Sequence, residues 1–471
     1  MRGFPVSIRW DRAAASHLAR RAGFGGTPAE VDGLLRMGLD AAVSSFVAYD
    51  GADNSALEAD LDRLTTPVAP ATTATYDLNT TSGIQKWFLH RMVFSRRPLE
   101  EKMTLLWNGH FTSGIAKVND ATLILKQNKT QRALALSRFD DLVLAMTRDP
   151  AMILWLDNRT NVKGRPNENY ARELMELFTL GVDRYTQKDV SELARALTGW
   201  TIAKAEGAPA SDYAFSFNAA AHDAGAKTIL GQTGTWNADE AIGIVLNATD
   251  GNGSLSGRFL AGKLWTWFVY HDPPDWAVAD LASVYVSSGH SIRAMVDRLF
   301  RMPEFYEPHS RQALVRSPVE YVVAPLRQLE AKTDFSTPVS SLNPMGQALF
   351  NPLDAKGWEG DLDWMNTGTV FARAAYTNSL VSNRGATGTR IDPAALVSGK
   401  SLTTPRDVVT ALADRLGLAD ALPGTQAVWE KYVDSKADGS RGYWTNTPAA
   451  VDQKVRGLLH LMLTSADYHL S

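Results

Sequence analysis

Residues 158–200 read NRTNVKGRPNENYARELMELFTLGVDRYTQKDVSELARALTGW, and this stretch decides the fold class. Its polar and apolar residues recur three and four positions apart, which predicts one helix over 167–180 and a second over 186–199. The same spacing recurs along most of the chain, whereas alternating strand patterns are few. We therefore expect an all-α protein, with one large multi-helix domain over 1–471 and a minor β-hairpin.

The remaining helices are predicted from the same periodicity and from capping residues at their starts. They are expected at 11–22, 28–48, 54–64, 82–95, 98–111, 130–147, 237–248, 253–270, 290–301, 317–332, 405–416 and 447–466. The hairpin is expected to pair the weakly alternating segments 212–217 and 227–230.

Two stretches are predicted to be loops. Residues 65–81 are rich in Thr, Ala and Pro, which favours a flexible excursion. Residues 334–364 contain several Pro and Gly but also large apolar residues. A loop of that length in a compact domain is usually functional or disordered. The apolar residues favour an ordered loop packed over something.

Composition excludes several classes of protein. The chain has 471 residues, 45% hydrophobic and 21% charged, with a net charge of -3 and no cysteine. We expect no nucleic-acid partner, because no basic run could follow a phosphate backbone. The absence of cysteine excludes disulfides, zinc-thiolate sites and a thiol nucleophile. The chain contains no apolar run of about 20 residues, so no membrane span is expected. No leader is visible at the start.

The predicted helix over 167–180 concentrates polar side chains on one face. Glu168, Arg172 and Glu176 form one row at a spacing of four, and Asn169 and Glu173 form a second row beside it. Clustered carboxylates separate their pKa values, as acid/base chemistry requires. The alternative is a set of exposed ion pairs worth a few tenths of a kcal/mol each.

Asp157 follows the apolar run from Met152 to Leu156. It opens the polar loop before the predicted helix over 167–180, which we call the glutamate helix. It is either a helix or loop cap or the carboxylate partner of Glu168. In the catalytic interpretation, Glu168 is the general acid, and Glu173, Glu176 or Asp157 is the base. Arg172 and Asn169 then tune the site and bind substrate.

Two histidines are candidates for lining the same cleft. His110 lies among aromatic residues at the end of a predicted helix, and His222 precedes Asp223 in a short polar block. Each imidazole is either a hydrogen-bonding core residue or a contact to substrate or metal. No HExxH pattern is present, so no metal-ligand set is predicted. A divalent metal held by both histidines and two glutamates stays open.

Trp358 and Trp364 lie in the Gly-rich part of the predicted loop 334–364. Their rings are either hydrophobic anchors for that loop or a wall that stacks on the apolar face of a sugar.

Several blocks together resemble one bacterial family, the domain-of-unknown-function family 1800. They include HLARRAGFGGTPAEVDGLL, EKMTLLWNGHFTS, NENYARELMELFTLG, KLWTWFVYHDPP and GQALFNPLDAKGWEGDLDW, and they cover almost the whole chain in order. The resemblance implies no assigned activity. It also implies export. Because no leader is visible in this chain, the compartment stays open.

Three functions are weighed on these patterns. The leading hypothesis is a carbohydrate-active enzyme that cleaves a polysaccharide by glycoside hydrolase-like acid/base chemistry or by elimination. A metal-dependent or redox enzyme is the second, and a non-catalytic glycan-binding or cell-surface scaffold is the third. The oligomeric state is not predicted by any pattern in the chain.

Overall fold

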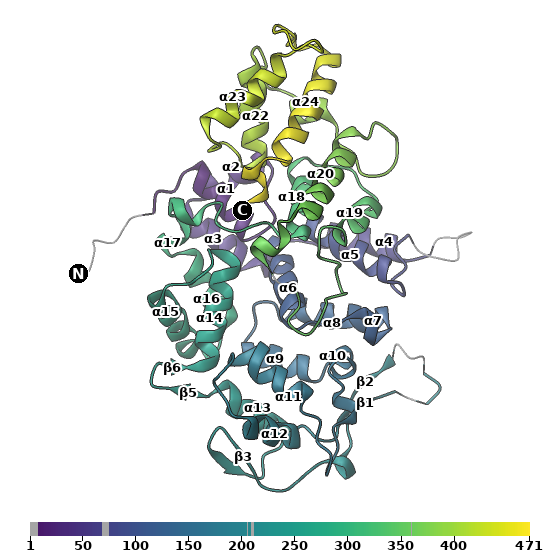
Figure 1. Ribbon diagram of the computed structural model, residues 1–471, viewed down its shortest axis with the longest axis vertical. Helices are drawn as coiled ribbons and strands as arrows, with labels where there is room; N and C mark the ends of the chain where they lie inside the picture. Colours follow the sequence, from purple (N-terminus) through teal and green to yellow (C-terminus); the bar gives the residue numbers. More distant parts are fainter. Residues whose placement is uncertain (1–7, 68–74, 205, 209–211, 359) are drawn as a thin grey trace, which may run out of the picture.

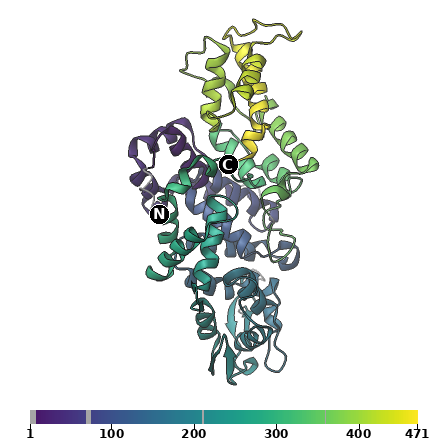
Figure 2. The same ribbon diagram turned by 60° about the vertical axis from the view of Figure 1, so that its left-hand side comes forward.

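The computed structural model describes residues 8–67, 75–204, 206–208, 212–358 and 360–471. Helices dominate these residues, which confirms the all-α prediction (Figure 1). The molecule is elongated, with α22 to α24 at one end and the strands β1 to β4 at the other (Figures 1 and 2). Within the described ranges, no helix is both long and apolar enough to cross a membrane.

The helices of the first half are α1 Arg12–Arg21, α2 Pro28–Met37, α3 Leu39–Val47, α4 Ser55–Thr65, α5 Thr81–Phe94, α6 Pro98–His110, α7 Ile115–Val118, α8 Ala121–Ala133, α9 Phe139–Thr147, α10 Pro150–Trp155, α11 Asn169–Glu173, the π-helix η3 Leu174–Thr179 and α12 Gln187–Ala196. Those of the second half are α13 Ala238–Leu246, α14 Leu255–Phe268, α15 Asp275–Ser287, α16 Ile292–Phe300, α17 Pro303–Tyr306, α18 Pro318–Gln328, α19 Ser336–Leu342, α20 Thr367–Ser382, α21 Pro393–Leu396, α22 Pro405–Leu416, α23 Pro423–Asp434, α24 Pro448–Leu463 and α25 Ala466–His469.

Several predicted helix boundaries were wrong for local reasons. The single helix expected at 28–48 is broken at Gly38, whose φ of 77° no helix interior accepts. The helix expected at 130–147 is two helices, α8 and α9, separated by a turn. Several helices were missed, and the longest of them are α15, α20 and α23. Thr, Ser and Gly weaken the local helix signal of α20, and Pro and Gly weaken that of α23. Burial of one face stabilises each of them.

The predicted hairpin has the wrong pairing. Both predicted segments contain strands, but they do not pair with each other. The strand β2 Ala214–Phe217 pairs with β1 Trp200–Ala203, and β3 Lys227–Ile229 pairs with β4 Gln232–Gly234. Leu230 and Gly231 both have positive φ, so a two-residue turn closes β3 onto β4. A third pair joins β5 Thr249–Asp250 to β6 Gly253–Ser254.

Two buried hydrophobic clusters form the interior. One gathers α1 to α3, α9 to α16 and most of α6, and the other gathers α4, α5, α8 and the helices from α18 onward. Leu106 and Trp107 of α6 belong to the first cluster, whereas Leu105 belongs to the second. Helix α6 therefore lies at the junction of the two clusters. The single-domain interpretation stays a prediction.

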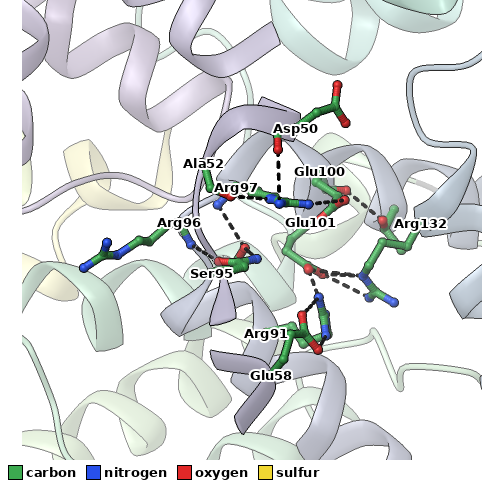
Figure 3. Close-up of polar contacts among 12 residues, drawn as sticks. Asp50, Ala52, Glu58, Arg91, Ser95, Arg96, Arg97, Glu100, Glu101 and Arg132 are labelled. Carbon is green, nitrogen blue, oxygen red and sulfur yellow. Dashed lines mark hydrogen bonds and ion pairs between the residues drawn. The ribbon is translucent and has the colours of Figure 1, made fainter. Parts of the chain in front are cut away.

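A buried ionic cluster fixes the start of α6 (Figure 3). The carboxylate of Glu101 is fully buried and accepts hydrogen bonds from Arg91 of α5 and Arg132 of α8, at 2.9 to 3.1 Å. Arg91 also forms a two-point contact with Glu58 of α4, at 2.7 and 2.9 Å. Four helices thus meet at one carboxylate, which fixes the axis of α6 and the position of His110 at its other end.

The predicted loops differ in how far the structure describes them. The centre of 65–81 lies outside the described residues, and its ends belong to α4 and α5. The segment 334–364 contains α19 and the short 3-10 helix η7 Asp361–Trp364. Its residues Met345, Leu349 and Phe350 are buried in the second cluster. These three buried side chains hold the residues after Phe350 against the rest of the protein.

Candidate functional site

One cavity of about 510 Å³ lies at the junction of the two clusters. Its walls are α6, the middle of α14, the start of α18 and the segment 347–364. The volume falls within the range of about 300–1,000 Å³ typical of small-molecule sites. We call it the tryptophan cavity, after the three lining residues Trp267, Trp358 and Trp364.

The aromatic wall comes largely from the predicted loop. Trp358 and Trp364 both line the tryptophan cavity and are only partly buried, so their rings remain accessible. Gly357 holds this segment close to α6: it has a φ of 87°, and a Cβ there would lie 2.4 Å from the carbonyl oxygen of Gly109. The approach of the two backbones therefore requires glycine.

His110 lies at the end of α6 on the cavity wall. Its Nε2 is 3.1 Å from the carbonyl oxygen of Phe178. A carbonyl only accepts, so Nε2 carries the proton and Nδ1 keeps its lone pair. Burial lowers the pKa of His110 well below its usual range, and the charge of Lys263 lowers it further. The ring is therefore a neutral hydrogen-bond acceptor beside the tryptophan cavity.

Two side-chain carboxylates line the tryptophan cavity, and sequence reasoning selected neither. The first is Glu320, in the first turn of α18. Its carboxylate pairs with Lys102 and accepts a hydrogen bond from the backbone of Ser317 at 2.8 Å. Burial opposes ionisation of Glu320, but these contacts outweigh it and lower the pKa below its ordinary value. Glu320 is therefore an ionised carboxylate.

The second carboxylate is Asp361, at the start of η7. One of its oxygens lies 3.3 Å from Nε2 of His271, which also lines the tryptophan cavity. The other accepts a hydrogen bond from the backbone of Val315 at 3.2 Å. A carboxylate that faces one ring nitrogen orients the imidazole and leaves the other nitrogen for proton transfer.

Two lysines complete the polar wall, Lys263 of α14 and Lys356 of the loop. Burial lowers the pKa of Lys263, although its side chain stays accessible from the tryptophan cavity. Lys356 also lies close enough to Glu173 of the glutamate helix for its charge to oppose part of the rise in the pKa of that carboxyl. The glutamate helix therefore lies next to the loop that forms the cavity wall.

The glutamate helix differs from its prediction. It is an α-helical turn, α11, followed by the π-helix η3. Glu168 and Arg172 form the expected pair at 3.1 Å, and Gln187 bonds both side chains at 2.7 and 2.8 Å. Asn169 is exposed. Neither these residues nor the other glutamates of this helix are among the residues that line the tryptophan cavity.

The other predicted carboxylates have separate surroundings. Burial and the neighbouring charge of Glu176 raise the pKa of the half-buried Glu173. Glu176 accepts a hydrogen bond from Tyr185 at 2.7 Å and not from Arg172. Asp157 forms an exposed ion pair with Lys117 at 2.8 Å. It is the N-cap residue of the 3-10 helix Asn158–Thr160, but its side chain accepts no capping hydrogen bond.

The two predicted histidines do not come together. His222 lies 2.9 Å, through Nδ1, from the carbonyl oxygen of Thr198 and packs edge-on against Phe217. That position is beside β2, not on the tryptophan cavity. Among the residues that the structure describes, no group of three His, Asp or Glu side chains has a metal-binding arrangement. The considered site of two imidazoles and two glutamates is not formed.

The structure thus gathers His110, Trp358 and Trp364 of the predicted residues in one place. It adds Lys263, His271, Glu320 and Asp361, which sequence reasoning missed. The only available signal was their position in blocks that carried the family resemblance: Lys263 and His271 lie in KLWTWFVYHDPP, Asp361 lies in GWEGDLDW, and Glu320 lies in RSPVEYVVAPLRQL.

The chain matches the family described as "Protein of unknown function (DUF1800)" over residues 17–470 and belongs to that family. This confirms the resemblance seen in the sequence. No curated protein and no solved structure matches the chain.

Proposed function

We propose that the protein is a carbohydrate-active enzyme that cleaves a sugar polymer by acid/base chemistry in the tryptophan cavity. One observation carries the proposal: Trp358, Trp364 and Asp361, from one short segment, line the same cavity as His271. Aromatic rings stack on the apolar faces of pyranose rings, and acid/base cleavage requires a proton donor and acceptor at the bound ring.

The roles follow from the surroundings of each group. Glu320, kept ionised by Lys102, would stabilise positive charge that develops at the anomeric carbon. The Asp361–His271 pair would transfer the proton to or from the glycosidic oxygen or the attacking water. His110 would accept a hydrogen bond from a sugar hydroxyl through Nδ1.

The glutamate helix supplies a second candidate site for the same activity. Its support is the raised pKa of Glu173, which suits a general acid, next to Glu176. In that arrangement Glu168 or Glu173 is the acid and Glu176 or Asp157 is the base, with Arg172 and Asn169 binding the sugar. Its side chains are largely engaged with one another, so we place it second.

A reducing-end release assay on a panel of polysaccharides, with and without chelator, tests the proposal. Two isosteric variants separate the two sites: Asp361→Asn and Glu168→Gln. Asparagine suits the left-handed backbone at position 361, where φ is 57°, and keeps the acceptor for Val315. We expect wild type and Glu168→Gln to release product and Asp361→Asn to lose at least a hundredfold in rate.

Each other outcome assigns the site differently. Loss of activity in Glu168→Gln alone would move the active site to the glutamate helix. Binding of glycans without turnover by wild type would support the scaffold hypothesis. Activity that chelator removes and added metal restores would support the metal-dependent hypothesis.

A further inference from the structure

We infer that the tryptophan cavity takes an acidic sugar, a pyranose that bears a carboxylate or a sulfate group, and that Lys263 binds this anionic group. The inference rests on the proposed function, because it assumes that the ligand is a carbohydrate. It adds the charge of the substrate and the residue that recognises it.

The charges on the wall of the tryptophan cavity are unevenly paired. Both lining carboxylates face cationic or imidazole partners: Glu320 pairs with Lys102, and Asp361 lies 3.3 Å from His271. The negative charge of Glu320 is therefore compensated by Lys102, and Asp361 has an imidazole partner within the protein.

The lining lysines are different. Among the described residues, Lys263 forms no ion pair, and its Nζ lies 5.7 Å from the centroid of the Phe259 ring. Lys356 likewise has no carboxylate partner among the described residues within salt-bridge distance, although Asp354 is near in sequence. The tryptophan cavity thus presents two positive charges that its own described residues leave without an ion pair.

Position makes Lys263 the stronger of the two. It projects from the middle of α14, close enough to His110 for its charge to lower the pKa of that ring. Lys263 keeps an exposed side chain, and the protein packed beside it lowers the pKa of its ammonium group. An anionic group placed beside Nζ would stabilise the ammonium form that the neighbouring protein disfavours.

The surrounding groups favour a sugar over a free anion. The anionic group would lie at Lys263 while the ring stacks on Trp358 or Trp364 and a hydroxyl donates to His110. A small inorganic anion would use only the first of these contacts.

Calorimetric titration of the full chain tests the inference. The probes are oligosaccharides of equal length that are neutral, built from uronic acid, or sulfated. The variants are Lys263→Met, which keeps the aliphatic stem, and Lys263→Arg, which keeps the charge. Lys188→Met, at an exposed position of α12, is the matched control.

We expect at least one acidic oligosaccharide to bind tenfold or more tightly than the neutral one, with an affinity that falls as salt rises. Lys263→Met should abolish that preference, Lys263→Arg should retain most of it, and Lys188→Met should not change it. The uronic acid and sulfated probes identify which anionic group is recognised. The preference should also fade as pH rises, sooner than for a lysine of ordinary pKa, because only the ammonium form binds the anion.

Equal affinity for neutral and acidic probes, or a preference that survives in Lys263→Met, would overturn the inference while the proposed function stands. Failure of every oligosaccharide to bind would overturn both. Tight binding of acidic probes without cleavage would support the inference and count against catalysis.

Discussion

Nε2 of His110 and the carbonyl oxygen of Phe178 lie 3.1 Å apart, and this contact joins α6 to the π-helix η3. The last carbonyls of a helix have no partner within it, so the imidazole supplies one for η3. The same contact directs Nδ1 away as the free acceptor. The glutamate helix thereby fixes the ring state of a residue on the tryptophan cavity, although its own carboxylates are elsewhere.

Replacing His110 by Phe should separate these two effects. The substitution leaves the Phe178 carbonyl without its donor, so we expect a loss of about 1–3 kcal/mol in the free energy of unfolding. It also removes the Nδ1 acceptor, so glycan affinity or turnover should fall at least tenfold in a protein that is still folded. Chemical denaturation and the reducing-end assay measure the two quantities. His222→Phe is the control, because His222 lies off the tryptophan cavity, and equal losses in both variants would contradict a specific role for His110.

Gly357 should be indispensable to the position of the loop. In Gly357→Ala the new Cβ would lie 2.4 Å from the Gly109 carbonyl oxygen, in addition to the strain of a φ of 87°. We expect a loss of about 1–3 kcal/mol in stability from the clash and at least a tenfold loss of glycan binding, because Trp358 is displaced.

Gly164→Ala is the matched control for that variant. Gly164 has a similar φ of 79° but no atom within 4 Å of its Cβ position. It therefore reports backbone strain alone, of about 1 kcal/mol. Unchanged binding in Gly357→Ala would show that the loop tolerates displacement and that Trp358 is not a binding residue.

The sequence allowed part of this site to be predicted because some of its residues carry local signals. Trp358 and Trp364 stand out in a Gly-rich loop, and His110 stands out among aromatic residues. Lys263 carries no such signal: a lysine in an amphipathic helix has the pattern of a surface residue. Only the tertiary fold, which brings α14 and α6 to the same cavity, places it there.

The glutamate helix shows why periodicity alone was insufficient. The rows of Glu168, Arg172 and Glu176 assume 3.6 residues per turn throughout. The π-helix η3 begins at Leu174 and widens the turn. The Glu168–Arg172 pair therefore forms, and the Arg172–Glu176 pair does not. Nothing in the local sequence announced the change of period. The catalytic roles of these residues stay a prediction.

Removing the charge of Glu101 should destabilise the protein strongly. Glu101→Gln would leave Arg91 and Arg132 buried with one formal charge uncompensated, and Nη1 of Arg132 already has no partner among the described residues. The expected loss in the free energy of unfolding is about 3–5 kcal/mol, the range for breaking a buried pair. Asp157→Asn, which removes an exposed pair with Lys117, should cost at most about 1 kcal/mol. Comparable midpoints of urea denaturation for the two variants would contradict this ranking.

Glu100, the neighbour of Glu101, should make the protein less stable as pH rises. The carboxylate of an ordinary ion pair has the opposite effect. Burial, together with the charge of Glu101, raises the pKa of Glu100 from 4.5 to about 7 (Figure 3). Between those values the folded protein holds a proton that the unfolded chain has released. The folded state is therefore progressively disfavoured as pH rises from about 4.5 to about 7, and the penalty is complete above 7.

Glu100→Gln removes this penalty, so it should raise the free energy of unfolding by about 1–3 kcal/mol at pH 8 and have little effect at pH 4.5. Denaturant melts of wild type and variant at both pH values measure the difference. A stabilisation that is the same at both would show that the glutamine acts through packing and not through the proton on Glu100.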